Sequence, residues 1–511
     1  MSDGVRAPRP EEIAQLGEAD RLALAAGEAE GLEPVIASLT DVQPLLDRLQ
    51  GVLELPAPTG RDPGWVPSSA ENPFNAFIRR CHVEGSGEGP LAGLTVGIKD
   101  NISLAGVRTT NGSRLEPYTP VHDAVVVERI LAAGGTIVGK LNMDDFGSTG
   151  LGESSAFGPP RNPVDPSRSA GGSSGGSGAA VRSGEVDLSL GVDQGGSGRI
   201  PAAFCGVVTV KGTHGLVPSW GITHIDHTID FVTPLARTVE RAALLLEVIA
   251  GADWRDAQWV RAAAEPQPYV AARDLGIEGL RIAVLEESAN PEVCDEAVLA
   301  NLEAAASALA AQGATVGRVS IPLWRDGLAM FLPYIGHLFS DTFRSEGQGG
   351  SHLGAYDVHS MEAYARARRE EGGLLAPQIK AWLIADRWMH ETYAGLPFAL
   401  LHNARLALRR AVSDAFAEWD LLLTPTLPMT APKLAGGETS FAEMSGRTSA
   451  RLCYNTAPLN LTGHPSISVP SGTDAEGLPT AVQIVAAAWE ETTAFRAAFA
   501  VERALAGVTA S

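Results

Sequence analysis

The chain has 511 residues, 45% of them hydrophobic, so it is long and apolar enough to bury a large core. Its 39 basic and 60 acidic residues give a formal net charge of −21, which argues against nucleic acid or an anionic membrane as a partner. No apolar signal region opens the chain, no uncharged apolar run could span a bilayer, and the four cysteines are scattered without disulfide or metal spacing. We therefore expect a cytoplasmic protein.

We expect residues 1–70 to form an N-terminal helical region. Apolar residues recur at helical spacing over residues 11–26 and 34–53. The stretch 56–73 is rich in proline and glycine and predicts a loop that leads into the rest of the chain, residues 71–511.

From residue 94 the pattern alternates between strands and helices. A strand is predicted over residues 94–99, a helix over 124–133 with Asp123 as its N-cap, and a strand over 136–140. A strand, a crossover helix and a strand in this order indicate parallel neighbours. Further elements are predicted as strands at 186–192, 280–285, 315–321 and 421–424 and as helices at 239–250 and 291–312.

Residues 322–415 carry a weaker pattern. They contain several large aromatic residues and a glycine-rich loop at 347–351. Helices are predicted over residues 361–369 and 380–411, and Pro397 is expected to interrupt the second.

Two glycine- and serine-rich motifs organise the chain: Gly-Gly-Ser-Ser-Gly-Gly-Ser at 171–177 and Asp-Gln-Gly-Gly-Ser-Gly-Arg at 193–199. A flexible linker is one interpretation of such runs. These runs, however, are short, are separated by apolar segments, and lead directly into the apolar stretch 200–206. Each lies at the end of a predicted element, where unpaired N–H groups can approach a ligand closely. We therefore favour a functional site.

Ser173 formally completes the G-x-S-x-G nucleophile elbow, but that motif needs an apolar strand before it, and residues 159–169 are too rich in proline. A phosphate-binding loop would end in Gly-Lys-Ser/Thr, which neither motif does. Ser197 is the better candidate for a nucleophile. The N–H groups of Gln194, Gly195 and Gly196 would then form its oxyanion hole.

A serine nucleophile needs a base, and Lys99 at the end of an apolar strand is the candidate. Burial lowers the pKa of a lysine, by up to ~3–5 units when burial is complete, and a neutral lysine can accept a proton. Ser–Lys pairs are a known variant of the catalytic triad. The alternative is a structural lysine that pairs with Asp100.

Three motifs in this order resemble the amidase signature family. They are Gly-Ile-Lys-Asp-Asn around Lys99, the glycine-serine run around Ser173, and Asp-Gln-Gly-Gly-Ser-Gly-Arg-Ile-Pro around Ser197, with the two serines twenty-four positions apart. The similarity covers residues 70–250 and 420–505 and is nearest to the nitrile-hydratase-associated enantioselective amidases. It implies a Ser-cisSer-Lys unit in which Ser197 is the nucleophile, Ser173 the bridging serine on a cis peptide bond, and Lys99 the general base and acid.

The resemblance also implies the fold class: one large α/β domain over residues 71–511, with a mixed, mostly parallel twisted sheet flanked by helices. In this family the section that corresponds to residues 322–415 varies and roofs the acyl pocket. The N-terminal helices of family members often mediate dimerisation, which makes a homodimer a candidate assembly.

The predicted reaction is hydrolysis of a small-molecule carboxamide to a carboxylic acid and ammonia or an amine, through an acyl-enzyme on Ser197, with neither metal nor cofactor. Two alternatives stay open. In one, an amine replaces water, or ammonia passes to a partner, as in the glutamine-tRNA amidotransferase subunits. The acidic charge disfavours a tRNA-linked role. The other alternative, a non-catalytic binding protein, is disfavoured because Lys99, Ser173 and Ser197 are all present.

Three residues are expected to contact the substrate. Gly147 and Ser148 follow the position where the family's backbone approaches the nucleophile. Gly198 stands where the family usually carries isoleucine or valine. We expect the missing side chain to leave room for a bulky, aryl or branched acyl group, or for Trp220 to fill that space. A backbone role for the glycine is the alternative.

Three other groups have both a functional and a structural interpretation. His224, His227 and Asp230 could suggest a metal site, but their spacing alone is weak, and we expect Asp230 to be structural and the histidines to line the pocket rim. Arg199 could bind a substrate carboxylate, although pairing with Asp193 is the better interpretation. The adjacent carboxylates at 144–145 could form a paired acid and base, but we expect them to be solvated or to cap a loop.

Overall fold

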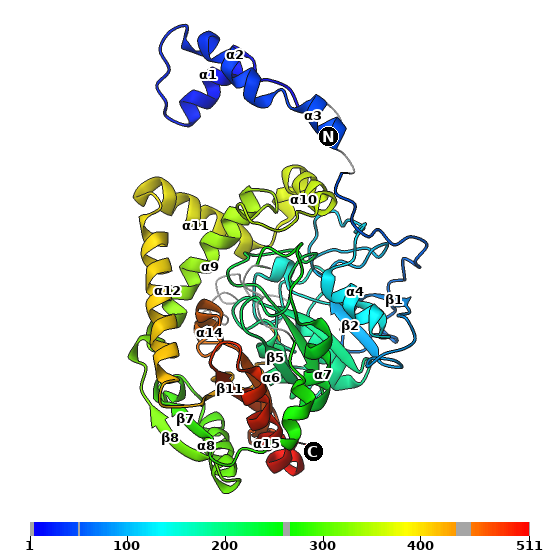
Figure 1. The fold of residues 1–511 in the computed structure, drawn as a ribbon, viewed down its shortest axis with the longest axis vertical. Helices are drawn as coiled ribbons and strands as arrows, with labels where there is room; N and C mark the ends of the chain where they lie inside the picture. The colour runs from blue at the N-terminus through cyan, green and yellow to red at the C-terminus, as the bar shows by residue number, and fades with distance from the viewer. Residues whose placement is uncertain (1–4, 50–51, 259–265, 436–450, 510–511) are drawn as a thin grey trace. The chain divides into compact units, whose positions relative to one another are not determined.

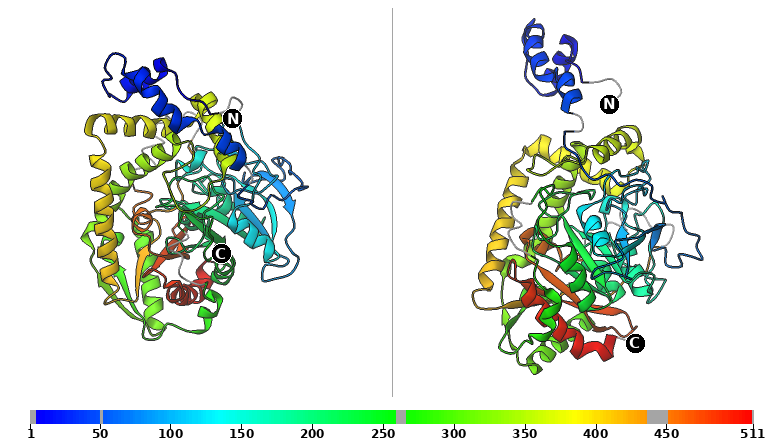
Figure 2. Two further views of the ribbon diagram at one scale, coloured as in Figure 1. Left: turned by 45° about the horizontal axis from the view of Figure 1, so that its top comes forward. Right: turned by 45° about the vertical axis from the view of Figure 1, so that its right-hand side comes forward.

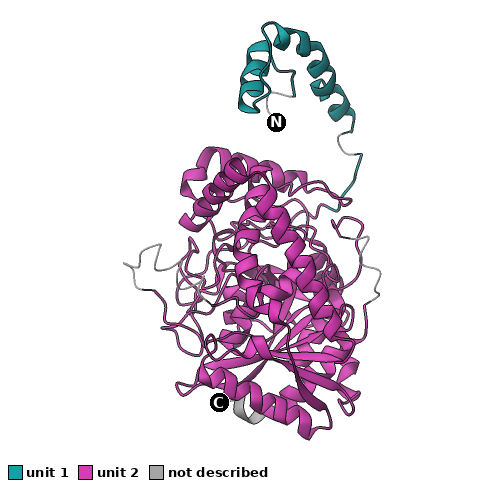
Figure 3. Cartoon of the chain, turned by 90° about the vertical axis from the view of Figure 1, so that its left-hand side faces the viewer, with its two compact units in different colours: residues 1–56 teal, residues 57–511 magenta. Residues whose placement is uncertain are grey.

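The computed structural model describes residues 5–49, 52–258, 266–435 and 451–509. Two compact units make up the chain, residues 1–56 and residues 57–511 (Figure 3). The first unit contains the helices α1 (Pro10–Ala19), α2 (Glu28–Thr40) and α3 (Gln43–Leu49). These are shorter than the helices predicted over 11–26 and 34–53. One break falls at Gly27, which precedes α2 in a left-handed conformation with φ +78°.

The second unit is built on one eleven-stranded sheet with the order β1-β3-β2-β4-β6-β5-β10-β11-β9-β7-β8. The strands are β1 (Phe77–Val83), β2 (Thr95–Lys99), β3 (Thr136–Leu141), β4 (Leu188–Asp193), β5 (Val208–Lys211), β6 (Phe231–Ala236), β7 (Arg281–Leu285), β8 (Thr315–Val319), β9 (Leu421–Pro425), β10 (Ser466–Thr473) and β11 (Pro479–Ala486). The sheet is mixed, as predicted. Among the described strands, however, antiparallel neighbours outnumber parallel ones six to four.

The balance differs from the expected parallel majority because of strands that β-α-β patterns do not reveal. The crossover units β2-α4-β3 and β7-α8-β8 do pair in parallel. The strand β6 instead pairs antiparallel with both β4 and β5, and β10 and β11 form an antiparallel hairpin.

Helices cover both faces of this sheet (Figure 1). They are α4 (Val125–Ala132), α5 (Gly175–Ser183), α6 (Arg199–Cys205), α7 (Val239–Ile249), α8 (Glu296–Ala311), α14 (Ala457–Thr462) and α15 (Glu491–Thr509). The largest hydrophobic core lies between the sheet and α4, α7, α8 and α15, whereas α5 and α6 pack together on the other face. Short 3-10 turns are η1 (Asp145–Gly147), η3 (Tyr269–Asp274), η4 (Glu286–Ala289), η5 (Pro322–Asp326) and η6 (Gly372–Leu374).

One predicted cap differs. The N-cap of α4 is Ala124, which makes no side-chain capping bond. The carboxylate of Asp123 instead forms a two-point ion pair with Arg61, with N···O distances of 2.5 and 2.7 Å. A buried carboxylate gains more from a bidentate guanidinium than from one backbone N–H, so Asp123 ties the loop at residues 56–73 to the sheet domain.

Residues 322–415 are mainly helical, and they form α9 (Gly327–Arg344), α10 (Val358–Glu371), α11 (Pro377–Tyr393) and α12 (Leu396–Ala415). The predicted interruption is confirmed, because the chain turns at Ala394, with φ +55°, two residues before the Leu396-Pro397 start of α12. Helices α11 and α12 both pack on α9, and both views in Figure 2 show the three together. No helix in the described ranges is long and apolar enough to cross a membrane.

Candidate active site

Lys99 is the last residue of β2, and its side chain is fully buried. Side chains alternate between the two faces of a strand, so Val96 and Ile98 point into the largest core. Lys99 lies on the opposite face, beside α5. The Lys99 Nζ lies 2.7 Å from the Ser173 Oγ and 3.2 Å from the Val192 carbonyl oxygen. Burial lowers the pKa of Lys99 to about 7. A lysine with this pKa is available as a base near neutral pH.

Ser173 lies just before α5, and the peptide bond between Gly172 and Ser173 is cis, as the resemblance implies. The next residue, Ser174, joins the two glycine-serine motifs. Its hydroxyl donates to the Val192 carbonyl at 3.1 Å, and its N–H donates to the Ser197 carbonyl at 3.1 Å. Because β2 and β4 are parallel neighbours, their carboxyl ends bring Lys99 and the loop after Val192 to the same edge of the sheet.

A buried ion pair holds the loop that carries Ser197. The Arg199 Nη2 lies 2.9 Å from the Asp193 Oδ1, and both side chains are fully buried. Asn460 donates to the same carboxylate at 2.9 Å, and Gln483 accepts from Arg199 at 2.9 Å. Burial alone would raise the pKa of Asp193, but the charge and hydrogen bonds of Arg199 outweigh it and hold that pKa well below its usual range. Arg199 therefore pairs with Asp193, as predicted.

The amides expected to form an oxyanion hole fall into two groups. The Gly196 N–H donates to the Asp193 Oδ1 at 2.8 Å, so the prediction is corrected for this residue. The N–H groups of Gln194, Gly195 and Ser197 have no hydrogen-bond partner within the described ranges. They lie between the end of β4 and the start of α6, outside any ladder or helix. These three amides remain available to an oxygen atom placed beside the Ser197 hydroxyl.

Ser197 opens on a pocket, here called the Ser197 pocket. Its walls come from the segments 147–150, 194–200 and 452–453 and from α9 and α11. The apolar lining residues are Ile200, Phe331, Leu332, Ile335, Trp382 and Leu452. Among the described residues that line it, none carries a charged side chain. The helices α9 and α11 both belong to the section 322–415.

Gly147 and Ser148 line the Ser197 pocket. A Cβ on Gly147 would lie 3.3 Å from the Ser173 Oγ, and Gly147 has φ +73°, so both contact and conformation favour glycine. The Ser148 Oγ is buried and makes no hydrogen bond to a described residue. The structure thus brings both predicted contact residues to the pocket.

Of the two neighbouring carboxylates, Asp144 caps a loop as predicted, and neither is solvated because both are buried. The Asp144 side chain accepts hydrogen bonds from the N–H groups of Gly152 and Ser154, at 2.9 and 3.0 Å, and from the Thr149 hydroxyl. It therefore fixes the loop that carries Gly147. Burial raises the pKa of Asp145 to about 6, but Asp145 does not line the Ser197 pocket.

The prediction for Gly198 is wrong in its physical reason. A Cβ on Gly198 would lie 3.1 Å from the Cβ of Thr233 and still closer to its hydroxyl oxygen. Thr233 on β6 therefore fills the space in which a bulky acyl group or Trp220 was expected. Trp220 lies elsewhere and donates from its indole N–H to the Ala355 carbonyl at 2.9 Å. With φ −93° the backbone of Gly198 needs no special conformation.

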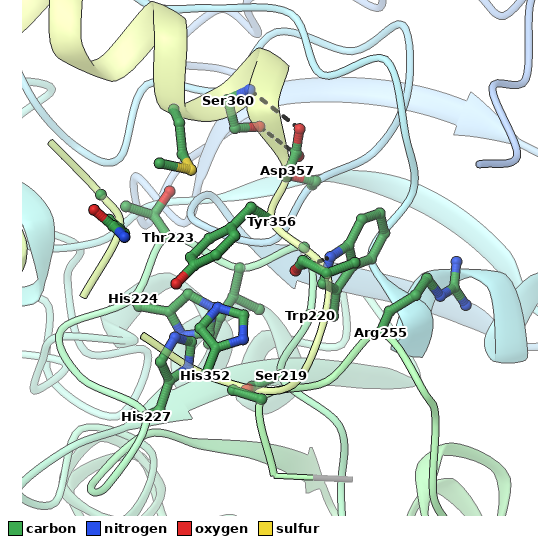
Figure 4. A pocket seen from close by; sticks show the side chains of 18 of the residues that line it. Ser219, Trp220, Thr223, His224, His227, Arg255, His352, Tyr356, Asp357 and Ser360 are labelled. Carbon is green, nitrogen blue, oxygen red and sulfur yellow. Dashed lines mark hydrogen bonds between the residues drawn. The ribbon is translucent and has the colours of Figure 1, made fainter. Parts of the chain in front are cut away.

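His224 and His227 line a second pocket that shares no lining residue with the Ser197 pocket. Figure 4 shows their imidazole rings gathered with that of His352, and Trp220 on another side of this pocket. The His224 Nδ1 lies 3.0 Å from the Asp230 Oδ2. Within the described residues no group of three or more histidine, cysteine or acidic side chains is arranged to hold a metal ion.

The sequence patterns did not reveal α9 or most of the Ser197 pocket wall. The spacing of Phe331, Ile335 and Phe339 is a helical signal that could have revealed α9. That spacing does not show which face of the helix packs against the catalytic motifs. The buried supports Asn460 and Gln483 lie within residues 420–505, the second part of the chain that the family resemblance covers, and the sequence analysis did not single them out.

The fold and the paired glycine-serine motifs together define an amidase. The Amidase family profile matches residues 76–495, and the chain therefore belongs to this family of enzymes. A glutamyl-tRNA(Gln) amidotransferase subunit of Halobacterium salinarum is 40% identical over 84% of this chain and 100% of its own length. The enantioselective amidase of Rhodococcus rhodochrous is 37% identical, covering 86% of this chain and 85% of the relative.

A solved structure agrees with these sequence relatives. The crystal structure of the corresponding glutamyl-tRNA(Gln) amidotransferase subunit from Thermotoga maritima superimposes with a TM-score of 0.70 and 34% identity. The superposition covers 84% of this chain and 88% of that structure. The fold predicted from the family resemblance, one large α/β domain with a mixed sheet, is thereby confirmed.

Proposed function

We propose that this amidase hydrolyses carboxamides whose acyl group is apolar, through an acyl-enzyme on Ser197. The observation that carries the proposal is the uncharged, largely apolar wall of the pocket on which Ser197 opens. Burying an apolar acyl group there is favourable, whereas a charged acyl group would lose its hydration and find no opposite charge on the described lining.

In the proposed reaction the Ser197 Oγ attacks the carbonyl carbon of the amide. Its proton passes to the Ser173 Oγ, while the Ser173 proton passes to the Lys99 Nζ, 2.7 Å away. The oxygen of the tetrahedral intermediate accepts hydrogen bonds from the free amides of Gln194, Gly195 and Ser197.

The intermediate then collapses, the C–N bond breaks, and the leaving amine takes a proton back along the same relay. Water attacks the ester at Ser197 and gives one proton to the relay. When this second tetrahedral intermediate collapses, the C–O bond to Ser197 breaks, the relay returns the proton to the Ser197 oxygen, and the carboxylic acid is released. Lys99 is neutral again at the end of the cycle. Gly147 and Ser148 lie beside Ser173 and the pocket, and we propose that they contact the substrate.

A second candidate function is suggested by the comparisons. Relatives named as glutamyl-tRNA(Gln) amidotransferase subunits reach 40% identity, above the 37% of the enantioselective amidase. A protein of that kind would pass ammonia to a partner protein. An amino-acid amide such as glutamine carries both an ammonium and a carboxylate, and each would need a charged or hydrogen-bonding partner near the pocket. The uncharged described lining favours the first proposal.

An ammonia-release assay distinguishes the two functions. We expect kcat/KM for benzamide and hexanamide to exceed that for L-glutamine by at least ~100-fold, because the charged groups of glutamine would be left unpaired. Ser197→Ala should remove the activity, and added hydroxylamine should yield the hydroxamate of the same acyl group. A preference for glutamine would favour the second candidate instead.

A further inference from the structure

Behind the Ser197 pocket lies another cavity, here called the distal cavity, between α9, α11 and α12. Its apolar lining includes Pro333, Met389, Phe398 and Leu401. Two residues, Leu332 and Trp382, line both the distal cavity and the Ser197 pocket. The two spaces are therefore separated by a partition made of one leucine and one indole ring.

The helical period explains this arrangement. On α9, Phe331 and Ile335 are four residues apart and both line the Ser197 pocket. Pro333 and His337, also four residues apart, both line the distal cavity. Helix α9 thus runs between the two spaces, and Trp382 reaches it from α11.

Packing alone holds Trp382 in the partition. Its ring lies 5.3 Å from that of Phe339 in an edge-on arrangement. Gly336 lies beside it, close enough that a Cβ there would touch the Trp382 Cδ1 at 3.6 Å, an ordinary van der Waals distance. No described residue forms a hydrogen bond with the indole N–H, so replacing Trp382 leaves no protein group without its partner.

The distal cavity is suited to an apolar or aryl group. Three ionisable side chains line it: Asp386, His337 and His390. Two of them are paired, because Asp386 contacts His337 at 2.7 Å and also bonds to Arg344. The ring of Phe398 lies 3.9 Å from that of His337, which presents a flat aromatic surface. A cavity whose walls are mainly apolar and aromatic binds uncharged carbon chains or rings in preference to ions.

We propose that Trp382, assisted by Leu332, closes the far end of the Ser197 pocket and sets the longest acyl group that the enzyme accepts. The inference rests on the proposed function, since it assigns the Ser197 pocket to the acyl group. Removing the indole joins the pocket to the distal cavity. Acyl chains too long for the wild-type pocket then have an apolar space to enter.

The test measures kcat/KM for unbranched primary amides from acetamide to dodecanamide. The wild-type enzyme should show a chain length above which kcat/KM falls sharply. Trp382→Ala should move this limit to longer chains and raise kcat/KM for amides beyond the wild-type limit by at least about tenfold. Amides well below the limit should show no such gain, because their acyl groups end before they reach Trp382. Leu332→Ala should shift the limit in the same direction but less.

Controls separate this effect from misfolding. Trp388 lies on the same helix, is 56% exposed, and lines neither space, so Trp388→Ala should leave the length limit unchanged. Trp382→Leu keeps part of the packing and should shift the limit if Trp382→Ala does not fold. A folded Trp382→Leu or Trp382→Ala enzyme with the wild-type length limit would overturn the inference.

A second readout keeps this inference distinct from the proposed hydrolysis. Alkyl fluorophosphonates of graded chain length react with a serine nucleophile without any amide being hydrolysed. Faster labelling of Trp382→Leu by the long probes, but not the short ones, supports the partition even if no amide is turned over. If the Trp382 variants hydrolyse amides but keep the wild-type dependence on chain length in both assays, the role of the partition is contradicted. The proposed function would still stand.

Discussion

Lys99 and Lys140 lie near the ends of neighbouring parallel strands, and both side chains are fully buried. Their surroundings differ. The Lys140 Nζ lies 3.2 Å from the Asp100 Oδ1 and 2.6 Å from the Thr109 hydroxyl. The Lys99 Nζ contacts a hydroxyl and a carbonyl oxygen, and no carboxylate of the described residues lies within 4 Å of it.

The difference separates a structural lysine from a candidate base. Burial lowers the pKa of both lysines. The charge of Asp100, in direct contact, opposes that effect at Lys140, whereas the carboxylates that oppose it at Lys99 form no ion pair with that lysine. Asp100 thus pairs with Lys140 and leaves Lys99 to Ser173, which answers the alternative raised by the sequence. Depth alone does not make a lysine a base. Whether a buried lysine can act as a base depends on the group that its amino group contacts.

The most damaging change should be Lys99→Met. A positioned general base contributes ~10²–10⁴-fold, so we expect kcat to fall by that factor. Thermal stability should be kept, because methionine fills the space and no charged partner is left behind. Steady-state kinetics and thermal unfolding followed by circular dichroism test this. A variant that keeps more than about a tenth of the wild-type kcat would show that another group takes the proton.

Lys140→Met should show the opposite pattern. It leaves the Asp100 carboxylate buried without its cation, which typically costs about 3–5 kcal/mol of unfolding free energy. The kcat of the folded enzyme should change little. Urea unfolding measures the loss, and the double variant Lys140→Met/Asp100→Asn should recover part of it. A loss of kcat without a loss of stability would contradict the structural role of Lys140.

The pH dependence should sharpen the contrast. Lys99 must be neutral to accept a proton, and its pKa is lowered to about 7. As the pH falls below 7, a growing fraction of Lys99 is protonated, so kcat/KM should fall about tenfold for each pH unit. Rates between pH 5 and 9, with folding checked by fluorescence at each pH, test this. A profile that stays flat down to pH 5 would rule out this role for Lys99.

The smallest effect concerns packing beside Ser197. Gly198→Ile should clash with Thr233 and cost about 1–3 kcal/mol of unfolding free energy. Activity should fall by the same factor for acetamide and for benzamide, because the added side chain points at β6 and not at the Ser197 pocket. Thr233→Ala in the same chain should restore part of the stability. Selective loss of benzamide hydrolysis would instead support the pocket role first expected from the sequence.

The catalytic motifs could be predicted from the sequence because each lies in one short segment. Glycine, serine and lysine at fixed positions indicated the resemblance, and the structure places Lys99 beside Ser173. The strands and helices of the β-α-β units were also predicted within a few residues. Local patterns of this kind depend on neighbours in the chain.

Contacts between distant segments could not be predicted. Thr233 reaches Gly198 only because β6 pairs antiparallel with β4, and no local pattern encodes that pairing. The Gly196 N–H donates to the Asp193 carboxylate and so cannot serve the oxyanion hole, and the sequence does not reveal the turn that brings the two together. Phe331 on α9 and Trp382 on α11 line the same pocket, and the sequence does not show that these two helices come together there. The homodimer, the cytoplasmic location and the boundary at residue 70 stay predictions.

Peptide mapping after reaction with a fluorophosphonate tests the central claim most directly. Trypsin cleaves after Arg168, Arg182 and Arg199, so Ser173 and Ser197 fall in different peptides. We expect an adduct on Ser197 in the peptide 183–199, which Ser197→Ala abolishes and Ser173→Ala only slows. An adduct on Ser173 in the wild-type enzyme would contradict the assignment of the nucleophile.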